Sequence, residues 1–255
     1  MEGPGIRFFA DNLQPVVGQR LEALAGERAE AVGPDAFVGR TLAEVVPAGK
    51  LLFFGFEGVE PVIRVHCLMF GDVRVNAGRD KTLTIRLAFE RDRVDAYLSA
   101  ARRATRAELE GARVPATRDM LDPRYRPGRN WDAAVEALPD RILGDALLDQ
   151  DLFPGLGNKI KVEALYRARV NPLDTVAALP RERGVALLKE AAAFSRHFLG
   201  AYEAGRHIQP SMRLYGRKRC PSCGGPVTKE EVGRLKRKSH WCPVCQPVTP
   251  VTPEP

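Results

Sequence analysis

Cys220-Pro-Ser-Cys223-Gly-Gly and Cys242-Pro-Val-Cys245 are the stretches that decide how the last part of this 255-residue chain folds. Each C-x-x-C motif presents two thiolates from one tight turn, and two such motifs can surround one tetrahedral Zn²⁺. Four of the five cysteines lie in these motifs and only Cys67 stands apart. Metal ligation is therefore favoured over disulfides. We expect Cys220, Cys223, Cys242 and Cys245 to hold a structural Zn²⁺.

The segment between the two cysteine pairs is strongly basic. Val227, Val232 and a turn at Gly233 predict a two-stranded ribbon. Its cations and histidine are Lys229, Arg234, Lys236, Arg237, Lys238 and His240. A ribbon of this size has no core of its own, so such a density of positive charge favours an edge that contacts phosphates. A basic hairpin that is merely solvated is the alternative.

Further upstream, residues 147–158 join two predicted helices through a turn. Gly155 and Gly157 allow the backbone to approach a bulky group closely, and Asn158 is placed to cap the following helix. Amide groups at a helix N-terminus form a natural phosphate seat, and Lys159 and Lys161 follow at once. Such a turn also serves simply to break a helix, so its spacing leaves both interpretations open.

The remaining patterns predict an α+β fold. Residues 1 to about 118 are mainly β, after an opening helix over roughly Ile6 to Ala25. The expected strands are short β-branched or aromatic runs at 51–54, 62–65 and 82–87. From about Asp122 the pattern is helical. The expected helices span 131–138 with Asn130 as N-cap, 141–150, 158–167 and 180–202. The proline-rich tail from Gln246 to Pro255 is expected to be disordered or extended.

Composition favours an ordinary globular protein with a polyanionic partner. The formal net charge is +7, although an arginine-rich composition alone also gives basic surfaces. No apolar run approaches the roughly 20 residues that span a bilayer, and the first residues lack the features of a secretory signal. We therefore expect no membrane partner and a cytoplasmic protein.

Taken together, the motifs resemble those of the formamidopyrimidine-DNA glycosylase and endonuclease VIII family. The resemblance covers residues 1 to 245, in family order. The features that carry it are Glu2-Gly3-Pro4-x-Ile6-Arg7, Gly49-Lys50-Leu51-Leu52, His66-x-x-Met69-x-Gly71, Leu147-Leu148-Asp149-Gln150, Gly155-Leu156-Gly157-Asn158, Tyr215-Gly216-Arg217 and the cysteine pairs.

The resemblance implies both a fold and a partner. It implies an N-terminal β-sandwich with a flanking helix over 1–118 and a helix–two-turn–helix domain over 119–214. A β-ribbon zinc finger over 215–246 and a proline-rich tail over 247–255 complete the expected domains. The implied partner is damaged DNA, double- or single-stranded, and the implied activity is that of a glycosylase and AP lyase in base excision repair.

The resemblance also implies roles for the first residues. In the family, the α-amine of an N-terminal proline attacks the sugar C1′, forms a Schiff base and starts β-elimination. Here no proline precedes Glu2, so Met1 supplies a primary α-amine in that register. Glu2 would act as general acid and base, or would only face the helix dipole. Lys50 would contact the phosphate beside the extruded nucleotide, or is a surface lysine at a strand start.

Other residues are expected to contact DNA. By the same resemblance, His66, Met69 and Phe70 lie where the family fills the gap left by a flipped base, with core packing as the alternative for Phe70 and Met69. The phosphates around the kink would be gripped by Asn158, Lys159 and Arg237. The short segment 204–215 favours oxidised pyrimidines, abasic sites or single-stranded lesions over oxidised purines.

Three functions remain open on the sequence. The first is an enzyme, a glycosylase and AP lyase of endonuclease VIII type. The second is a non-catalytic or weakly catalytic binder of damaged DNA, favoured by the missing proline and by Gly5, which stands where the family usually has a second glutamate. The third is a zinc-ribbon protein of transcription or translation, which leaves Glu2, Lys50 and Asn158 unexplained.

Overall fold

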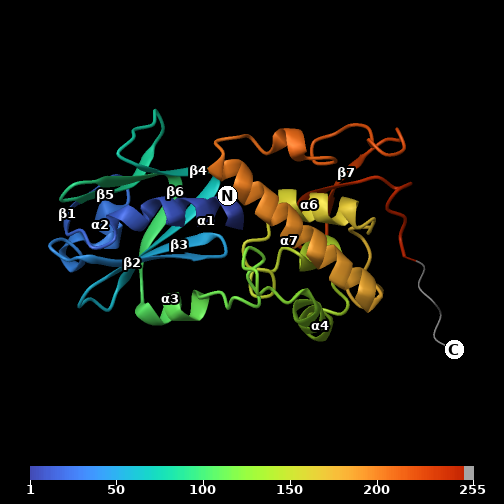
Figure 1. Ribbon diagram of the computed structural model, residues 1–255, viewed down its shortest axis with the longest axis horizontal. Helices are drawn as coiled ribbons and strands as arrows, with labels where there is room; N and C mark the ends of the chain where they lie inside the picture. The colour runs from blue at the N-terminus through green and yellow to red at the C-terminus, as the bar shows by residue number, and fades with distance from the viewer. Residues whose placement is uncertain (250–255) are drawn as a thin grey trace. The chain divides into compact units, whose positions relative to one another are not determined.

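A computed structural model describes residues 1–249 and divides the chain into two compact units, the first spanning Met1–Val114 and the second beginning at Pro115 (Figure 1). The first unit is a β-sheet with helices. The second combines helices with a two-stranded ribbon. Each unit has its own buried apolar core.

The first unit contains one six-stranded sheet. Its strands are β1 (Leu21–Ala25), β2 (Leu42–Ala48), β3 (Leu51–Phe56), β4 (Val62–Val75), β5 (Leu83–Phe89) and β6 (Arg93–Ala104). They form one antiparallel sheet in the order β1-β5-β6-β4-β3-β2. The register between β4 and β6 breaks after Cys67↔Ser99 and resumes at Asp72↔Tyr97. One half-sheet therefore contains β2, β3 and the first part of β4, and the other contains β1, β5 and the second part.

The two half-sheets enclose a common core. Buried side chains of β3 and of the first part of β4 pack in one cluster with those of β5 and β6. The helix α1 (Gly3–Leu13) adds Ile6, Phe9 and Leu13 to this cluster. The short elements η1 (Gln14–Val16), α2 (Ala29–Val32), η2 (Pro34–Ala36) and α3 (Arg106–Ala112) complete the unit. The expected β-sandwich with a flanking helix is confirmed.

The opening helix is shorter than the sequence pattern suggests. It ends at Leu13, and the expectation of a helix to Ala25 is wrong. Pro15 lies in the 3₁₀ turn that follows, and Gly18 has a φ of +88°, a conformation that glycine adopts without strain. The chain then enters β1, whose pairing with β5 outweighs the helical spacing of its apolar residues.

The second unit contains α4 (Pro127–Ala137), α5 (Leu143–Ala146), α6 (Asn158–Arg167), α7 (Arg181–Glu203), η3 (Gln209–Ser211), β7 (Thr228–Val232) and β8 (Arg237–Trp241). α5 and α6 flank the predicted two-turn connection. β7 and β8 pair antiparallel across the turn at Gly233, as the ribbon prediction requires. The α+β assignment and the ribbon are both confirmed.

Two helix predictions in this unit fail for local reasons. α4 begins at Pro127, and Asn130 is a buried residue inside the helix rather than its cap. A helix over 141–150 is wrong because only 143–146 is helical. The Asp149 carboxylate accepts hydrogen bonds from the amides of Asp151 and Leu152, which favours a turn over continued helix.

The start of the tail is fixed to the second unit. The Gln246 side chain is buried and donates to the Val170 carbonyl at 2.7 Å. Thr249 donates to the Asp174 carboxylate through its amide and its hydroxyl. Of the two predicted forms of the tail, disorder is therefore wrong for Gln246 and Thr249, while an extended tail is compatible with these contacts; residues 250–255 lie outside the described residues.

Within residues 1–249 no helix has the length and apolar character needed to cross a bilayer.

The packing of α4 against α7 depends on a glycine. A Cβ at Gly184 would lie 1.9 Å from the ring of the buried Trp131. We expect Gly184→Ala to lower the free energy of unfolding by about 1–3 kcal/mol, the cost of overpacking. Gly200→Ala on the same helix is the control, because no atom lies within 4 Å of its Cβ. Helix propensity predicts up to about 1 kcal/mol of stabilisation there.

Guanidinium denaturation followed by circular dichroism measures both effects. Equal midpoints for the two variants would contradict this account of the α4–α7 contact.

Candidate functional site

Four residues of β4 stand out from the first unit as a protrusion. Residues 68–71 lie between the paired positions Cys67↔Ser99 and Asp72↔Tyr97, so they face the single residue Leu98 across the sheet. Leu98 itself has a φ of +47°. Leu68 is 47% exposed, and Met69 and Phe70 are each 71% exposed. Core packing is thus excluded for Met69 and Phe70. Apolar side chains this exposed indicate contact with another molecule.

The protrusion closes at Gly71. A Cβ at this position would lie 2.8 Å from the Leu68 nitrogen and 2.9 Å from the Cys67 Cα. Both are backbone atoms, which a side chain cannot push aside cheaply. Glycine therefore allows the chain to return to the β4–β6 pairing immediately after Phe70.

The α-amine of Met1 lies at the base of the protrusion. It donates a hydrogen bond to the Cys67 carbonyl at 3.1 Å and another to the Leu68 carbonyl at 2.8 Å. Glu2 follows as the N-cap residue of α1, and its carbonyl accepts from the Gly5 amide. The first turn of α1 thus delivers the terminal amine to β4, beside the exposed side chains of the protrusion.

Two further predicted residues share this environment. Lys50 precedes β3, whose first residue, Leu51, pairs with His66 on β4. Burial lowers the pKa of His66 below its ordinary value, and the positive charges of the Met1 amine, Arg64 and Lys50 lower it further. His66 is therefore neutral at neutral pH. The structure brings Met1, Lys50 and His66 together around the base of the protrusion.

Cys67, on the same strand, is a thiol rather than a thiolate. Burial raises its pKa to about 11, and a hydrogen bond with Ser99 offsets part of this effect. Since the thiolate is the nucleophilic form, Cys67 supplies no nucleophile at neutral pH. It packs in the sheet core, as the sequence suggests.

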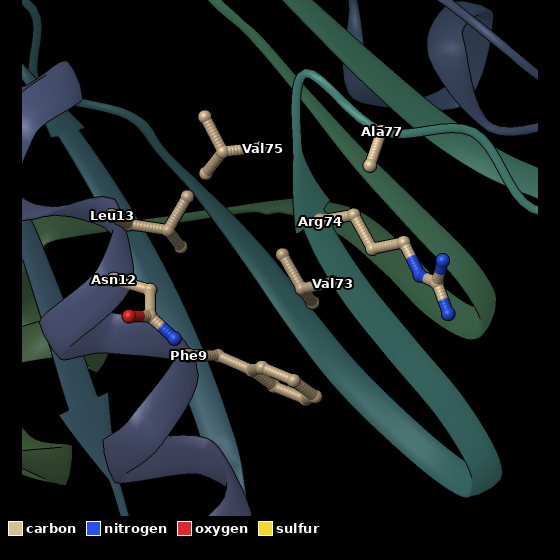
Figure 2. Close-up of a pocket in the computed structure, with 7 residues that line it drawn as sticks. All are labelled: Phe9, Asn12, Leu13, Val73, Arg74, Val75 and Ala77. Carbon is tan, nitrogen blue, oxygen red and sulfur yellow. The ribbon is translucent and has the colours of Figure 1, made fainter. Parts of the chain in front are cut away.

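An open cavity of about 460 Å³ lies between α1 and the second part of β4 (Figure 2). Its lining is mostly apolar, and its residues are Phe9, Asn12, Leu13, Val73, Arg74, Val75 and Ala77. Arg74 is engaged with Asp72 through a 2.8 Å contact. No predicted catalytic or DNA-contacting residue lines this cavity, so it is separate from the candidate site.

In the second unit, Gln150 organises the connection before α6. Its side-chain amide donates to the Leu156 carbonyl at 3.1 Å, and its oxygen accepts from the Gly155 amide at 3.2 Å. Gly155 has a φ of +82°, which favours glycine. Gly157 is the N-cap of α6 and Asn158 its first helical residue, so the prediction of Asn158 as the cap is wrong.

The side chain of Asn158 reaches the ribbon. Its Nδ2 donates to the Lys238 carbonyl at 2.9 Å. Lys238 follows Arg237, the exposed first residue of β8. The Asn158 side chain therefore contacts β8 one residue after Arg237. Lys159 follows Asn158, and its Nζ lies 5.9 Å from the centre of the Phe198 ring.

Lys161 and Glu163 have roles that the sequence pattern does not reveal. Lys161 is fully buried rather than part of a surface seat, and its Nζ donates to Ser239 Oγ at 2.7 Å and to the Gly144 carbonyl at 3.2 Å. Buried Glu163 accepts from the amides of residues 213, 214 and 215. The sequence predicted a helix over 158–167, but nothing in it distinguished these buried charges from solvated ones.

The four predicted metal ligands converge. The sulfurs of Cys220, Cys223, Cys242 and Cys245 all lie within 4.8 Å of one another. The Cys220–Cys245 and Cys223–Cys242 sulfur pairs are 3.7 and 3.5 Å apart. In a tetrahedron with 2.3 Å zinc–sulfur bonds, the sulfurs are about 3.8 Å apart. The donor set and its spacing therefore fit one tetrahedral metal ion.

Tyr166, on α6, approaches this cluster. Its hydroxyl lies 3.5 Å from Cys220 Sγ and 2.6 Å from Ser222 Oγ. A hydroxyl that contacts a metal-binding thiolate supplies a hydrogen bond that holds the ligand in place. One helix thus contacts the ribbon at Asn158 and Lys161 and the cysteine cluster at Tyr166.

Comparison with known proteins finds relatives with the names of DNA-repair enzymes. The chain is 29% identical to Endonuclease 8-like 3 of Mus musculus over 98% of its length and 47% of that protein. It is 39% identical to Endonuclease 8-like 2 of Mus musculus over 52% of the chain and 40% of that protein. The chain thus spans about half the length of the curated relatives it matches. No family model matches.

Comparison with solved structures identifies proteins with the same fold. The MutM (Fpg) protein of Thermus thermophilus superposes with a TM-score of 0.78 at 25% identity, over 98% of this chain and 100% of that one. A viral DNA glycosylase superposes with a TM-score of 0.86 at 22% identity, over 96% and 100%. The chain is thus similar to members of the formamidopyrimidine-DNA glycosylase and endonuclease VIII family and shares their fold.

The contribution of the contact between Lys161 and Ser239 to stability can be measured as a coupling free energy. We expect Ser239→Ala to lower the free energy of unfolding by about 1.5–3 kcal/mol, because it removes a buried hydrogen bond from a charged donor. In the background of Lys161→Met the same change should cost little. A double-mutant cycle by denaturation gives the coupling, and additive effects of the two substitutions would contradict a direct contact.

Proposed function

We propose that this protein is a DNA glycosylase and AP lyase of endonuclease VIII type, acting in base excision repair on oxidised pyrimidines or abasic sites. The observation that carries the proposal is the position of the Met1 amine. It is held at the base of the Met69–Phe70 protrusion and shares its environment with Lys50 and His66. We place this activity in the cytoplasm, at the nucleoid, in a monomer.

The first step is access to the damaged nucleotide. A base inside a duplex must leave the stack before its sugar can be attacked. Met69 and Phe70 are exposed and apolar, so they can enter the gap and replace the lost stacking. Because the Met1 amine is bound to the carbonyls at the base of this protrusion, an extruded sugar next to the gap would lie near the amine.

The chemical step uses the amine as nucleophile. An α-amine has a pKa near 8, so a useful fraction is unprotonated at neutral pH. The Met1 nitrogen attacks C1′, the bond from C1′ to the base breaks, and the base leaves with a proton. Ring opening gives a Schiff base between Met1 and C1′. Loss of a C2′ proton then breaks the bond from C3′ to the phosphate oxygen, which cuts the strand.

The neighbouring residues move protons and hold phosphate. Glu2, adjacent to Met1 in the chain, is the general acid and base at the sugar. Lys50 holds the phosphate beside the extruded nucleotide, and neutral His66 donates or accepts a hydrogen bond there. In the second unit, Asn158, Lys159 and Arg237 contact backbone phosphates.

The four cysteines fit a structural Zn²⁺, which contributes folding free energy to the ribbon and no chemistry at the sugar. Its role is to hold β7 and β8, and therefore Arg237, against α6. Damaged DNA is the proposed partner in double- or single-stranded form.

Two features of the sequence favour a second candidate function. No proline precedes Glu2, and Gly5 occupies the position of a further glutamate in the family pattern. A damaged-DNA-binding protein with little or no lyase activity would keep the protrusion and the ribbon but form no covalent intermediate.

Borohydride trapping on an abasic oligonucleotide tests the nucleophile. We expect a covalent adduct at Met1, identified by mass spectrometry of the N-terminal peptide. Glu2→Gln should slow trapping by about 100-fold or more, the usual contribution of a general acid–base group. A chain extended by one residue before Met1 should lose about 100-fold, because the amine no longer lies at the Cys67 and Leu68 carbonyls.

Trapping that is unchanged in the extended chain would place the nucleophile on a lysine instead. Salt-dependent DNA binding without any adduct would favour the non-catalytic function.

The proposed zinc site leads to predictions for the number of zinc ions per chain and for the rate of zinc release. We expect one zinc ion per chain and its loss in Cys220→Ser. Tyr166→Phe should speed zinc release to a chelator by about tenfold, because it removes a hydrogen bond to a ligand sulfur. Tyr125→Phe, which removes a buried hydroxyl outside the cysteine cluster, is the matched control. A protein purified without zinc, yet with an ordered ribbon, would contradict the assignment.

A further inference from the structure

We propose that Arg79 is a positioning residue that holds the 68–71 protrusion in the form able to enter DNA. This inference rests on the proposed role of Met69 and Phe70 as the residues that fill the gap. It assigns the brace of the protrusion to a loop residue between β4 and β5, outside the candidate site itself.

Arg79 contacts the protrusion directly. Its NH1 donates to the Phe70 carbonyl at 3.3 Å and lies 3.3 Å from the Asp72 carboxylate. One guanidinium nitrogen therefore contacts both the Phe70 carbonyl and Asp72, the first residue after the protrusion that pairs with β6. With the Phe70 carbonyl held on this side, the side chains of Met69 and Phe70 are both 71% exposed.

Arg79 is itself fixed to the sheet. Its amide donates to the Tyr97 hydroxyl at 3.2 Å, and that hydroxyl donates to Asp95 at 3.0 Å. Asp95 is fully buried and binds Arg86 through two contacts of 2.7 and 2.8 Å. The chain of contacts thus runs from a buried ion pair through Tyr97 to the loop that carries Arg79.

Asp95, the first residue in this series of contacts, keeps its negative charge. Burial alone would raise the pKa of Asp95, but the hydrogen bonds from Arg86 and Tyr97 hold it below its ordinary value. Asp95 is therefore a carboxylate at neutral pH, and Tyr97 keeps its hydroxyl hydrogen directed to it. The Tyr97 oxygen is then oriented to accept from the Arg79 amide.

Such a brace matters most when a duplex has to be opened. Exposed apolar side chains gain by folding back onto the protein, and a protrusion of four residues has no core of its own to prevent this. Holding it in the bound form beforehand removes an ordering cost from the binding step. In single-stranded DNA no stack has to be opened, so the brace should matter little there.

Arg74 provides a matched control. Its Nε contacts the same Asp72 carboxylate at 2.8 Å, and its NH1 donates to the Gly78 carbonyl rather than to Phe70. Arg74→Ala and Arg79→Ala remove the same charge from the same neighbourhood. They differ in the contact to the Phe70 carbonyl.

The test uses the full chain and a duplex with 2-aminopurine next to a tetrahydrofuran abasic analogue. Stopped-flow fluorescence reports insertion of the protrusion beside the probe. We expect Arg79→Ala to slow this phase by about tenfold, the scale of one lost hydrogen bond to a charged group. Arg74→Ala should leave it unchanged, and Arg79→Lys should restore part of the rate. Affinity for the single-stranded oligonucleotide should be equal in all variants and confirms folding.

The outcomes separate this inference from the enzymatic function. Equal slowing in Arg74→Ala and Arg79→Ala would overturn the brace in favour of a general charge effect, and so would an unchanged rate in Arg79→Ala. Because the fluorescence signal needs no chemistry, it tests the brace even if borohydride trapping shows that wild-type protein forms no Schiff base. Absence of any fluorescence change with wild-type protein would overturn the brace together with the role of the protrusion.

Discussion

The two hydrogen bonds from the Met1 amine to the Cys67 and Leu68 carbonyls are the constraint on which the candidate site depends. They fix a chain terminus, which is ordinarily among the least ordered parts of a protein. They also place it beside exposed Met69 and Phe70. The register break in β4 leaves residues 68–71 opposite the single residue Leu98, and the side chains of Met69 and Phe70 are exposed there.

In the second unit, α6 has the equivalent role. Its side chains bind three separate segments: the ribbon through Asn158 and Lys161, the 213–215 backbone through Glu163, and the first cysteine pair through Tyr166. A two-stranded ribbon cannot bury enough apolar surface to be stable alone. The cysteine cluster lies at one end of it, and α6 contacts β8 at Lys238 and Ser239, next to Arg237.

Elements with a strong local signal were predictable from the sequence. The cysteine pairs, the ribbon and α6 follow from motif spacing and from unbroken helical periodicity. Predictions failed in two places: Leu21–Ala25 pairs with β5 instead of continuing the opening helix, and after α5 the Asp149 side chain binds the amides of a local turn where a continued helix was expected. The hydrogen bonds that link Asp95, Tyr97 and Arg79 could not be predicted from the sequence. They join β6 to the loop between β4 and β5, and such contacts produce no periodic sequence pattern.

In the proposed mechanism, the primary α-amine of Met1 suits the geometry of the carbonyls. A neutral secondary amine has one N–H, whereas a neutral primary amine has two N–H groups and one lone pair. Two N–H groups can satisfy the Cys67 and Leu68 carbonyls together, and the lone pair is then directed away from both oxygens. The same contacts that hold the amine would thereby aim its lone pair outward from β4. In the proposed mechanism, these two hydrogen bonds therefore orient the amine as well as hold it.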